Sequence, residues 1–302
     1  MKKTLRIITL FIICLCFSCI LPGHIEAAKK NAGDVAKLQK IINSQIKQTP
    51  PHSPSLSKDI KTDKHYKWDK NGYLKSIYWD TSPLYGSMKI PSFKKLKSIY
   101  IYDTVMLKVL KIEDNKSLKS LICHNNPFGA DEQDENYGFN KLQIKGCHNL
   151  RRISTGGNNK NSINLDLSNY PKLKELSLDL NYIKEIDLSQ NKQLESLDLS
   201  YNDLEEIDLS NNNKLKKINL NNNKLKKLDI SNLTNLQELQ CSGNQISSLD
   251  LTNNTKLETL YCPRNKITEL DIHNCKKLIE NSVSYFQDSL ICDNNVKIKK
   301  HK

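Results

Sequence analysis

The sequence repeats itself with a period of 21 residues. Each unit opens with the pattern L-x-x-L-x-L-x-x-N, and its first leucine recurs at Leu173, Leu194, Leu215, Leu236, Leu257 and Leu278. A strict period in this range indicates a unit that cannot bury its apolar face alone and is stabilised by stacking against its neighbours. The chain is therefore predicted to fold as a solenoid with one coil per unit.

The same pattern continues towards the N-terminus with irregular spacing. Earlier units begin at Leu74, Leu96, Leu118 and Leu150, with spacings of 22, 22, 32 and 23 residues. These spacings indicate insertions of one, one, eleven and two residues. Nine units thus run from Leu74 to about Lys277, and the eleven-residue insertion falls between Asn126 and Leu142.

The L-x-L part of each unit predicts a short strand, because alternate side chains of a strand point to opposite faces. Leu197 and Leu199 are expected to point inward, and Ser196, Asp198 and Ser200 outward. The predicted fold class is an α/β repeat, a solenoid with a curved parallel sheet whose strands line the concave wall.

Two polar rows accompany the leucines. The asparagines are expected to satisfy buried backbone groups of adjacent coils; they are Asn181, Asn202, Asn223, Asn244 and Asn265. The aspartates either cap turns or bind calcium; they are Asp166, Asp187, Asp208, Asp229, Asp250 and Asp271. Turn capping is favoured, because the sequence lacks the glycine-rich loops of calcium-binding β-rolls.

Both ends of the solenoid need a cap, which divides the chain into residues 1–27 (signal peptide), 28–73 (N-terminal cap), 74–277 (repeats) and 278–302 (C-terminal cap). Asp34 is expected to cap a helix. One face of that helix carries Val35, Leu38, Ile41, Ile42 and Ile46. A hairpin that turns at Asn71-Gly72 is expected to lead into the first repeat strand.

Residues 1–27 have the layout of a secretory signal peptide. Lys2, Lys3 and Arg6 precede an apolar run from 7 to 21, and Glu26-Ala27-Ala28 forms a small-residue exit. That run is shorter than the roughly 20 residues needed to span a bilayer. The mature chain is predicted to lack a transmembrane segment and to be secreted or extracellular. Lipidation of Cys19 remains an alternative.

The mature chain is basic, with a net charge of +11 after residues 1–27 are removed. This charge favours anionic partners such as a cell-wall polymer, although a lysine-rich solvated surface is the simpler interpretation. Nearly all the cations are lysines, whereas forked phosphate recognition relies on arginine. Nucleic acid is therefore disfavoured as a partner.

Cysteine placement and the N-terminal segment resemble a known family. Cys123, Cys241 and Cys262 occupy the third apolar position of L-x-x-L-x-L, which is similar to an internalin subclass with a buried cysteine ladder. The stretches DVAKLQKIINSQIKQ and YKWDKNGYLKSIYW resemble the N-terminal cap of Gram-positive leucine-rich-repeat surface proteins. Over residues 34–298 the chain is similar to secreted bacterial leucine-rich-repeat proteins of the internalin type.

That resemblance implies an extracellular module that recognises a protein ligand, whose identity and host or bacterial origin it does not specify. Such proteins often continue into a wall-anchoring tail, whereas this sequence ends in VKIKKHK. Release into the medium, or retention on the wall by charge, is therefore expected in place of covalent display.

The outward strand positions of the first units predict where a partner binds. Tyr78, Tyr100, Tyr102, Ile122 and His124 are expected to lie side by side, and exposed aromatic clusters are typical binding hot spots. The neighbouring insertion adds four acidic residues, Asp131, Glu132, Asp134 and Glu135. We predict that these nine residues form the partner site. Alternatively, the tyrosines pack against the N-terminal cap or are covered by the loop.

No pattern of catalytic, cofactor-binding or metal-binding residues is evident. The histidines are scattered and show neither metal-ligand nor base-nucleophile spacing, and no glycine-rich phosphate loop is present. The chain is predicted not to be an enzyme. A remote alternative is a cysteine nucleophile at Cys292 beside Asp293, and a disulfide between Cys275 and Cys292 is left open.

Overall fold

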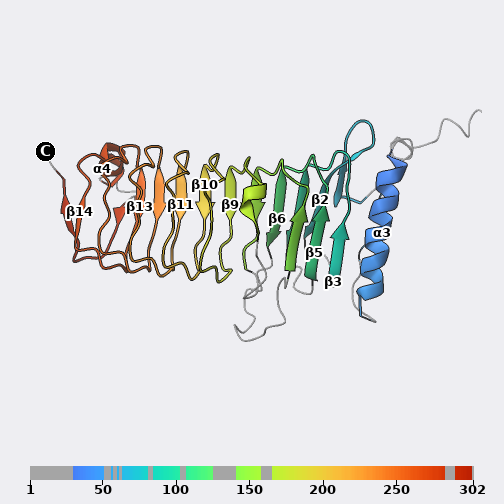
Figure 1. Cartoon of the computed structure of the whole chain (residues 1–302), viewed down its shortest axis with the longest axis horizontal. Coiled ribbons are helices and arrows are strands. Elements are labelled where there is room, and N and C mark those ends of the chain that lie inside the picture. Colours follow the sequence, from blue (N-terminus) through green and yellow to red (C-terminus); the bar gives the residue numbers. More distant parts are fainter. Residues whose placement is uncertain are drawn as a thin grey trace, which may run out of the picture.

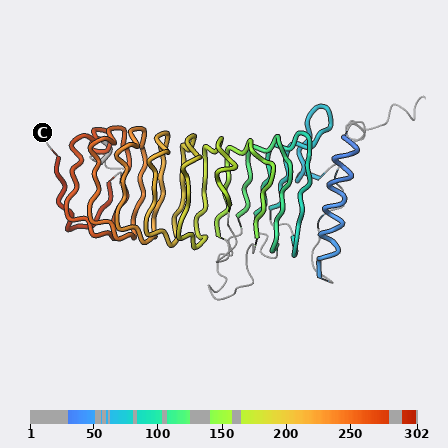
Figure 2. The backbone as a smooth tube through the Cα atoms, viewed as in Figure 1, coloured from blue at the N-terminus to red at the C-terminus, as the bar shows by residue number. Residues whose placement is uncertain are grey.

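The computed structural model describes residues 30–50, 56, 60, 63–80, 84–102, 107–124, 141–157, 165–282 and 290–300. The coils stack into one elongated solenoid, with the N-terminal helix α3 at one end and the C-terminal strands at the other (Figures 1 and 2). This architecture confirms the predicted leucine-rich-repeat solenoid.

The main sheet takes one strand from each coil. Its eleven strands lie in the order β1 (Tyr66–Trp68), β2 (Leu74–Asp80), β4 (Ser98–Tyr102), β6 (Ser120–His124), β8 (Arg152–Ser154), β9 (Glu175–Ser177), β10 (Ser196–Asp198), β11 (Lys217–Asn219), β12 (Glu238–Gln240), β13 (Thr259–Tyr261) and β15 (Leu290–Ile291). Among the described strand pairs of this sheet, only β1–β2 is antiparallel. Sequential coils therefore lie side by side in chain order.

Equivalent residues of successive coils lie opposite one another. Leu197 on β10 is opposite Leu176 on β9 and Ile218 on β11, and all three are buried. Because the side-chain period of a strand is two, a one-residue slip would turn every leucine of a coil outward. The leucine pattern thus fixes the register, and each sequence position becomes a column along the solenoid.

The predicted asparagine row is confirmed as a connector between coils. Asn202 donates from Nδ2 to the carbonyls of Leu178 and Leu199, at 2.9 and 3.0 Å. Its Oδ1 accepts the backbone N–H of Ile183 at 2.9 Å. Equivalent bonds are made by Asn223, Asn244 and Asn265. Asn181, in the first regular coil, makes the donor bond to the carbonyl of Thr155 at 2.8 Å.

A second buried asparagine row was not predicted. Asn212 donates from Nδ2 to the carbonyls of Leu188 and Asn191, both at 3.1 Å. Asn191 and Asn254 hold the same place in other coils. The 21-residue spacing was visible in the sequence, but the direction of these side chains became clear only in the structure.

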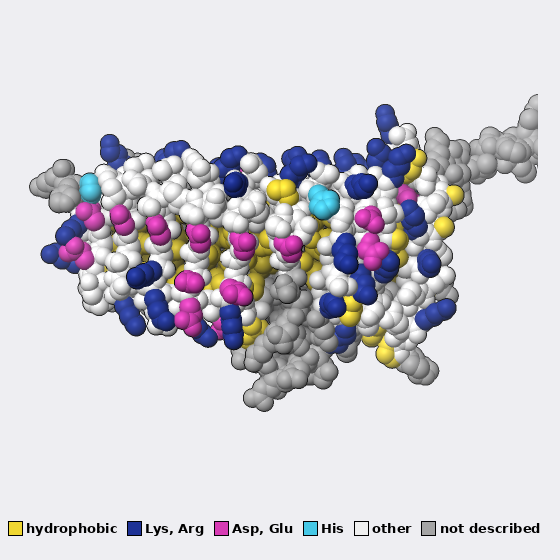
Figure 3. Space-filling view, viewed as in Figure 1, with side chains coloured by type: hydrophobic (Ala, Val, Ile, Leu, Met, Phe, Trp, Pro, Cys, Tyr) yellow, Lys and Arg dark blue, Asp and Glu magenta, His cyan; other side chains and the backbone are white. Residues whose placement is uncertain are grey.

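The aspartate row caps turns, as predicted. Asp208 accepts the backbone N–H of Ser210 at 2.8 Å, and this bond lowers the pKa of the Asp208 carboxyl. The bond recurs at Asp166, Asp187, Asp229, Asp250 and Asp271. Figure 3 shows such carboxylates as a regular line along one face of the solenoid. Within the described ranges, no group of three or more His, Cys, Asp or Glu side chains is arranged to hold a metal ion.

A second sheet, which was not predicted, lies across the coils of the N-terminal half. It consists of the parallel strands β3 (Gly86–Ile90), β5 (Leu107–Glu113) and β7 (Lys141–Lys145). Each strand carries an alternating apolar pair on its buried face, such as Met88 and Ile90. The later coils keep a buried apolar pair at the equivalent place, such as Leu228 and Ile230, with the capping Asp229 between its two members.

The N-terminal cap has the predicted helix and hairpin, with one correction. The helix α3 runs from Ala32 to Gln48, and its N-cap is Asn31, whose Oδ1 accepts the N–H of Asp34 at 3.0 Å. Asp34 is itself buried and accepts the N–H of Leu74 at 2.9 Å. Its carboxylate therefore attaches the helix to the first repeat strand. The expected turn follows β1, with Gly72 at φ +77°.

The end of the chain closes the solenoid with an additional coil. It contains α4 (Lys276–Ser282), β15 on the main sheet, and β16 (Lys297–Lys299) paired in parallel with β14 (Glu269–Asp271). In the part of the chain that the structure describes, no helix has the length and apolar character of a bilayer span.

Removal of one connecting amide should be costly. Asn202→Ala is expected to lower the free energy of unfolding by about 3 kcal/mol, because a lost bond leaves a buried backbone group unsatisfied at about 1–3 kcal/mol each. Urea denaturation followed by circular dichroism measures this loss. The exposed Asn213→Ala is the matched control and should change stability by less than about 0.5 kcal/mol. Equal losses in both variants would contradict the connecting role.

Candidate partner-binding surface

The predicted aromatic residues lie on three neighbouring strands of the main sheet. Tyr78 of β2 is in register with Tyr100 of β4. One row further along the strands, Tyr102 of β4 is in register with His124 of β6. The uniform register of the sheet therefore brings these four side chains together.

The four rings form a continuous stack, which we call the aromatic stack: Tyr78, Tyr100, Tyr102 and His124. The centroids of Tyr78 and Tyr100 are 4.4 Å apart, with the ring planes within 9° of parallel. Tyr100 and Tyr102 follow at 6.5 Å, and Tyr102 and His124 at 5.9 Å. All four side chains are half-buried. Ring faces contact one another, so the stack presents ring edges and phenol hydroxyls to a partner.

Contacts with polar neighbours fix both ends of the stack. Ser154 of β8 lies with its Oγ 2.7 Å from Nε2 of His124, and Lys67 of β1 places its Nζ 4.8 Å from the ring centroid of Tyr78. Neither contact was predicted, because Ser154 is in register with Ile122 and reaches His124 in the neighbouring column. The cap hairpin therefore contacts Tyr78 through a cation–π interaction.

The Tyr102 hydroxyl is protonated at neutral pH, as that of tyrosine ordinarily is. Desolvation is the main cause that raises the pKa of the Tyr102 phenol, and the neighbouring Tyr100 adds to it. The hydroxyl is therefore a hydrogen-bond donor at neutral pH. This side chain offers a partner both apolar ring surface and a polar contact.

The expected exposure of Ile122 was wrong. Its register places it between Tyr100 and Ser154, but only 5% of its side chain is exposed. A short aliphatic side chain among taller rings loses its access to solvent. Ile122 thus supports the stack from below and is not available to a partner.

The four acidic residues of the predicted site lie outside the described residues. Asp131, Glu132, Asp134 and Glu135 belong to the insertion, of which residues 125–140 are not described. Their part in a partner site stays a prediction.

A separate apolar group is exposed on the loops that follow the strands. Leu180 and Tyr201 hold equivalent places in adjacent coils, each with a positive φ of 56°, and Tyr182 lies nearby in sequence with a φ of 57°. Their exposures are 43%, 56% and 44%. Asn222 and Gly243 hold the same place in later coils, where the left-handed backbone suits them better. These tyrosines do not belong to the aromatic stack.

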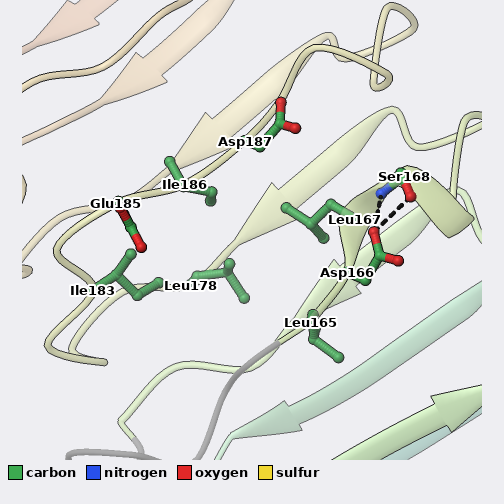
Figure 4. Close-up of a pocket in the computed structure, with 9 residues that line it drawn as sticks. All are labelled: Leu165, Asp166, Leu167, Ser168, Leu178, Ile183, Glu185, Ile186 and Asp187. Atoms are coloured by element: carbon green, nitrogen blue, oxygen red, sulfur yellow. Dashed lines mark hydrogen bonds between the residues drawn. The ribbon is translucent and has the colours of Figure 1, made fainter.

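A cleft of about 430 Å³ lies in the coils that follow the second sheet (Figure 4). Its apolar lining includes Leu165, Leu178 and Ile186, and its polar lining includes Asp166 and Asp187. Both aspartates already accept backbone N–H groups in capped turns. The lining therefore does not present convergent groups for chemistry.

Cys292 does not have the environment of a nucleophile. Burial, followed by the charge of Asp293, raises the pKa of the Cys292 thiol, whereas a reactive cysteine needs a lowered pKa. The Asp293 carboxylate accepts the backbone N–H of Arg264 at 2.9 Å. Cys275 and Cys292 are both free thiols, and Cys275 lies close to the carbonyls of the preceding coil.

The predicted cysteine column is buried. Cys123, Cys241 and Cys262 are all inside the solenoid, and burial raises the pKa of Cys262 to about 12. Cys262 donates its backbone N–H to the carbonyl of Ile291, the residue before Cys292. Cys241, Cys262 and Cys292 thus hold equivalent positions in three successive coils.

Comparisons with known proteins concern the fold. InlP of Listeria monocytogenes matches with a TM-score of 0.52 and 20% identity, over 88% of this chain and 69% of InlP. The functional domain of InlJ from the same organism, whose description includes a cysteine ladder, matches with a TM-score of 0.47 and 21% identity over 70% of this chain. The leucine-rich-repeat protein LIC12759 of Leptospira interrogans gives 0.44 and 20% over 66% of this chain.

This chain spans 53% of the InlJ structure and 54% of the LIC12759 structure, about half of each. No family model matches the sequence, and comparison with curated proteins gave no match. The likeness to InlP, together with the 21-residue coils and the N-terminal cap, identifies the fold: the chain has an internalin-like leucine-rich-repeat fold.

Proposed function

We propose that this protein is an extracellular recognition module that binds a protein partner on the outward face of its main sheet, centred on the aromatic stack. The fold supports this proposal because solenoids present one extended surface made of short, equivalent strands. Extracellular location rests on the predicted signal peptide in residues 1–27, which lie outside the described residues.

The aromatic stack is the observation that carries the proposal. Tyrosine is enriched at binding hot spots because it combines large apolar area with a polar tip. In this protein the rings are held by one another, by Lys67 and by Ser154. A preordered surface loses little side-chain entropy on binding, so more of its contact energy appears as affinity.

In the middle coils the outward face is polar and hydrogen-bonded within itself. Asn221 donates to Gln240 at 3.0 Å, and Asn219 donates to Asp198 at 3.1 Å. Such a surface can form the polar rim of an interface but offers little apolar area. We therefore place the centre of the interface at the N-terminal coils.

The stack can be tested by substituting two of its rings. The chain from Ala28 is immobilised, candidate proteins are captured from host cell surfaces or bacterial walls, and each is purified and titrated by calorimetry. Tyr100→Ala/Tyr102→Ala should raise Kd at least about 10-fold, a loss of about 1.4 kcal/mol. Its melting temperature should fall by only a few degrees, because the rings are half-buried.

The matched control is Tyr182→Ala/Tyr201→Ala, which removes two exposed tyrosines outside the stack. It should leave Kd within about two-fold of the wild type. Equal weakening by both variants would show that tyrosine loss in general, and not the stack, weakens binding. Unfolding of the Tyr100/Tyr102 variant would show that these rings belong to the core.

The acidic insertion requires its own test. Deletion of residues 128–138 should weaken binding of the same purified partner by several-fold and leave the solenoid folded, because the deletion removes only inserted residues between two coils. Circular dichroism checks the fold, and calorimetry checks the affinity. Unchanged affinity would remove Asp131, Glu132, Asp134 and Glu135 from the proposed site.

A further inference from the structure

A column of cations runs beside the aromatic stack, at the residue that follows the first leucine of each unit. Its backbone groups connect coil to coil: Lys97 N–H donates to Lys75 O and Lys119 N–H to Lys97 O, each at 2.8 Å. Arg151 and Lys174 continue the series, again at 2.8 Å. We call Lys75, Lys97, Lys119, Arg151 and Lys174 the basic column.

The fold does not require cations at this position. In the C-terminal coils the same column continues as Glu195, Lys216, Gln237 and Glu258. There the charges neutralise one another: Glu195 pairs with Lys174 at 2.5 Å and with Lys216 at 2.9 Å. Hydrogen bonds from these two lysines lower the pKa of Glu195 to about 2. The uniform charge of the N-terminal half is therefore a property of this sequence and not of the repeat.

Four members of the basic column form no ion pair with another described residue. The ion pairs among the described residues include Lys174 but not Lys75, Lys97, Lys119 or Arg151. Lys97, Lys119 and Arg151 are exposed. Neighbouring coils are about 4.8 Å apart, where two like charges repel by roughly 1 kcal/mol even in water. An anionic partner would relieve this repulsion.

The basic column is continuous with the proposed interface. Only the outward serines Ser76, Ser98 and Ser120 lie between it and the tyrosines along the strands. Figure 3 shows Lys and Arg side chains gathered along the upper edge of the solenoid, the edge on which α4 lies in Figure 1. A partner seated on the aromatic stack would cover the serines and reach the cations.

We propose that the basic column binds an extended acidic segment of the partner polypeptide, an inference that rests on the proposed function and specifies the chemistry of the partner. The four members without an ion pair span about 14 Å at the strand spacing, which corresponds to about four residues of extended chain. The serine hydroxyls can donate to carboxylates and peptide carbonyls of such a segment.

Phosphate polymers fit this surface less well than an acidic peptide. Four of the five cations are lysines, which lack the planar fork of arginine for bidentate phosphate recognition. Single-stranded nucleic acids bind by stacking bases on free aromatic faces. In this protein the faces of Tyr78 and Tyr100 contact each other at 4.4 Å.

The test uses fluorescein-labelled poly-L-glutamate and fluorescence anisotropy at 50 mM salt. Lys97→Glu/Lys119→Glu/Arg151→Glu should weaken its binding at least 10-fold. The control Lys184→Glu/Lys227→Glu/Lys266→Glu makes the same change in net charge at exposed positions elsewhere and should weaken binding less than two-fold. Melting temperatures establish that both variants are folded.

Further arms separate the alternatives. Tyr100→Ala/Tyr102→Ala keeps the basic column and should bind poly-L-glutamate within two-fold of the wild type. This measurement therefore tests the basic column independently of the proposed role of the aromatic stack. Equal weakening by the column and control variants would overturn the proposal in favour of net charge alone. Tighter binding of inorganic polyphosphate or duplex DNA than of poly-L-glutamate would overturn it in favour of a phosphate polymer. Undetectable binding of poly-L-glutamate would also overturn it.

Discussion

Stacking of one coil on the next in a fixed register is the constraint on which the whole structure depends. Each coil leaves backbone N–H and C=O groups inside the solenoid, where an unsatisfied group costs free energy. Asn202 and its equivalents use their amides to satisfy groups of their own and of adjacent coils. The leucines contribute non-directional burial, whereas the amides and strands determine which residue lies beside which.

A fixed register turns each position of the 21-residue unit into a line along the surface. Substitutions within the repeat therefore determine what each line presents, without a change in fold. Tyr78 and Tyr100 place aromatic rings on one line, and Lys97 and Lys119 place cations on another. In the C-terminal coils the second line contains Glu195, which neutralises its lysine neighbours. The two halves of one solenoid thus differ in chemistry at equivalent positions.

The repeated part of the fold could be predicted because its signals recur in every unit. The inward leucines, the asparagine amides and the aspartate caps were all readable from spacing and residue type. The N-terminal helix was predicted too, but Asp34 was assigned the capping role that Asn31 performs. Both residue types cap helices well, and only the contact with Leu74 shows where the Asp34 side chain points.

Features that depend on neighbours in space were harder to predict. Ile122 has an outward position by alternation, yet the rings beside it exclude water. The sheet of β3, β5 and β7 uses apolar pairs such as Met88 and Ile90, which hold the place of Leu228 and Ile230 in the later units. The residue pattern alone therefore did not distinguish a strand from a capped turn at this place. Side-by-side placement of the four aromatic residues was predicted correctly, whereas their stacking geometry and the contacts of Lys67 and Ser154 came from the structure.

The distance between two spin labels tests the stacked register most directly. Glu175 and Thr259 hold the same position on β9 and β13, four coils apart. Labels attached to cysteines at these two sites, in a background without other reactive thiols, should give one narrow distribution near 19 Å, four times the strand spacing of about 4.8 Å. A broad distribution, or a mean beyond about 30 Å, would contradict the stacked coils and the surface columns that depend on them.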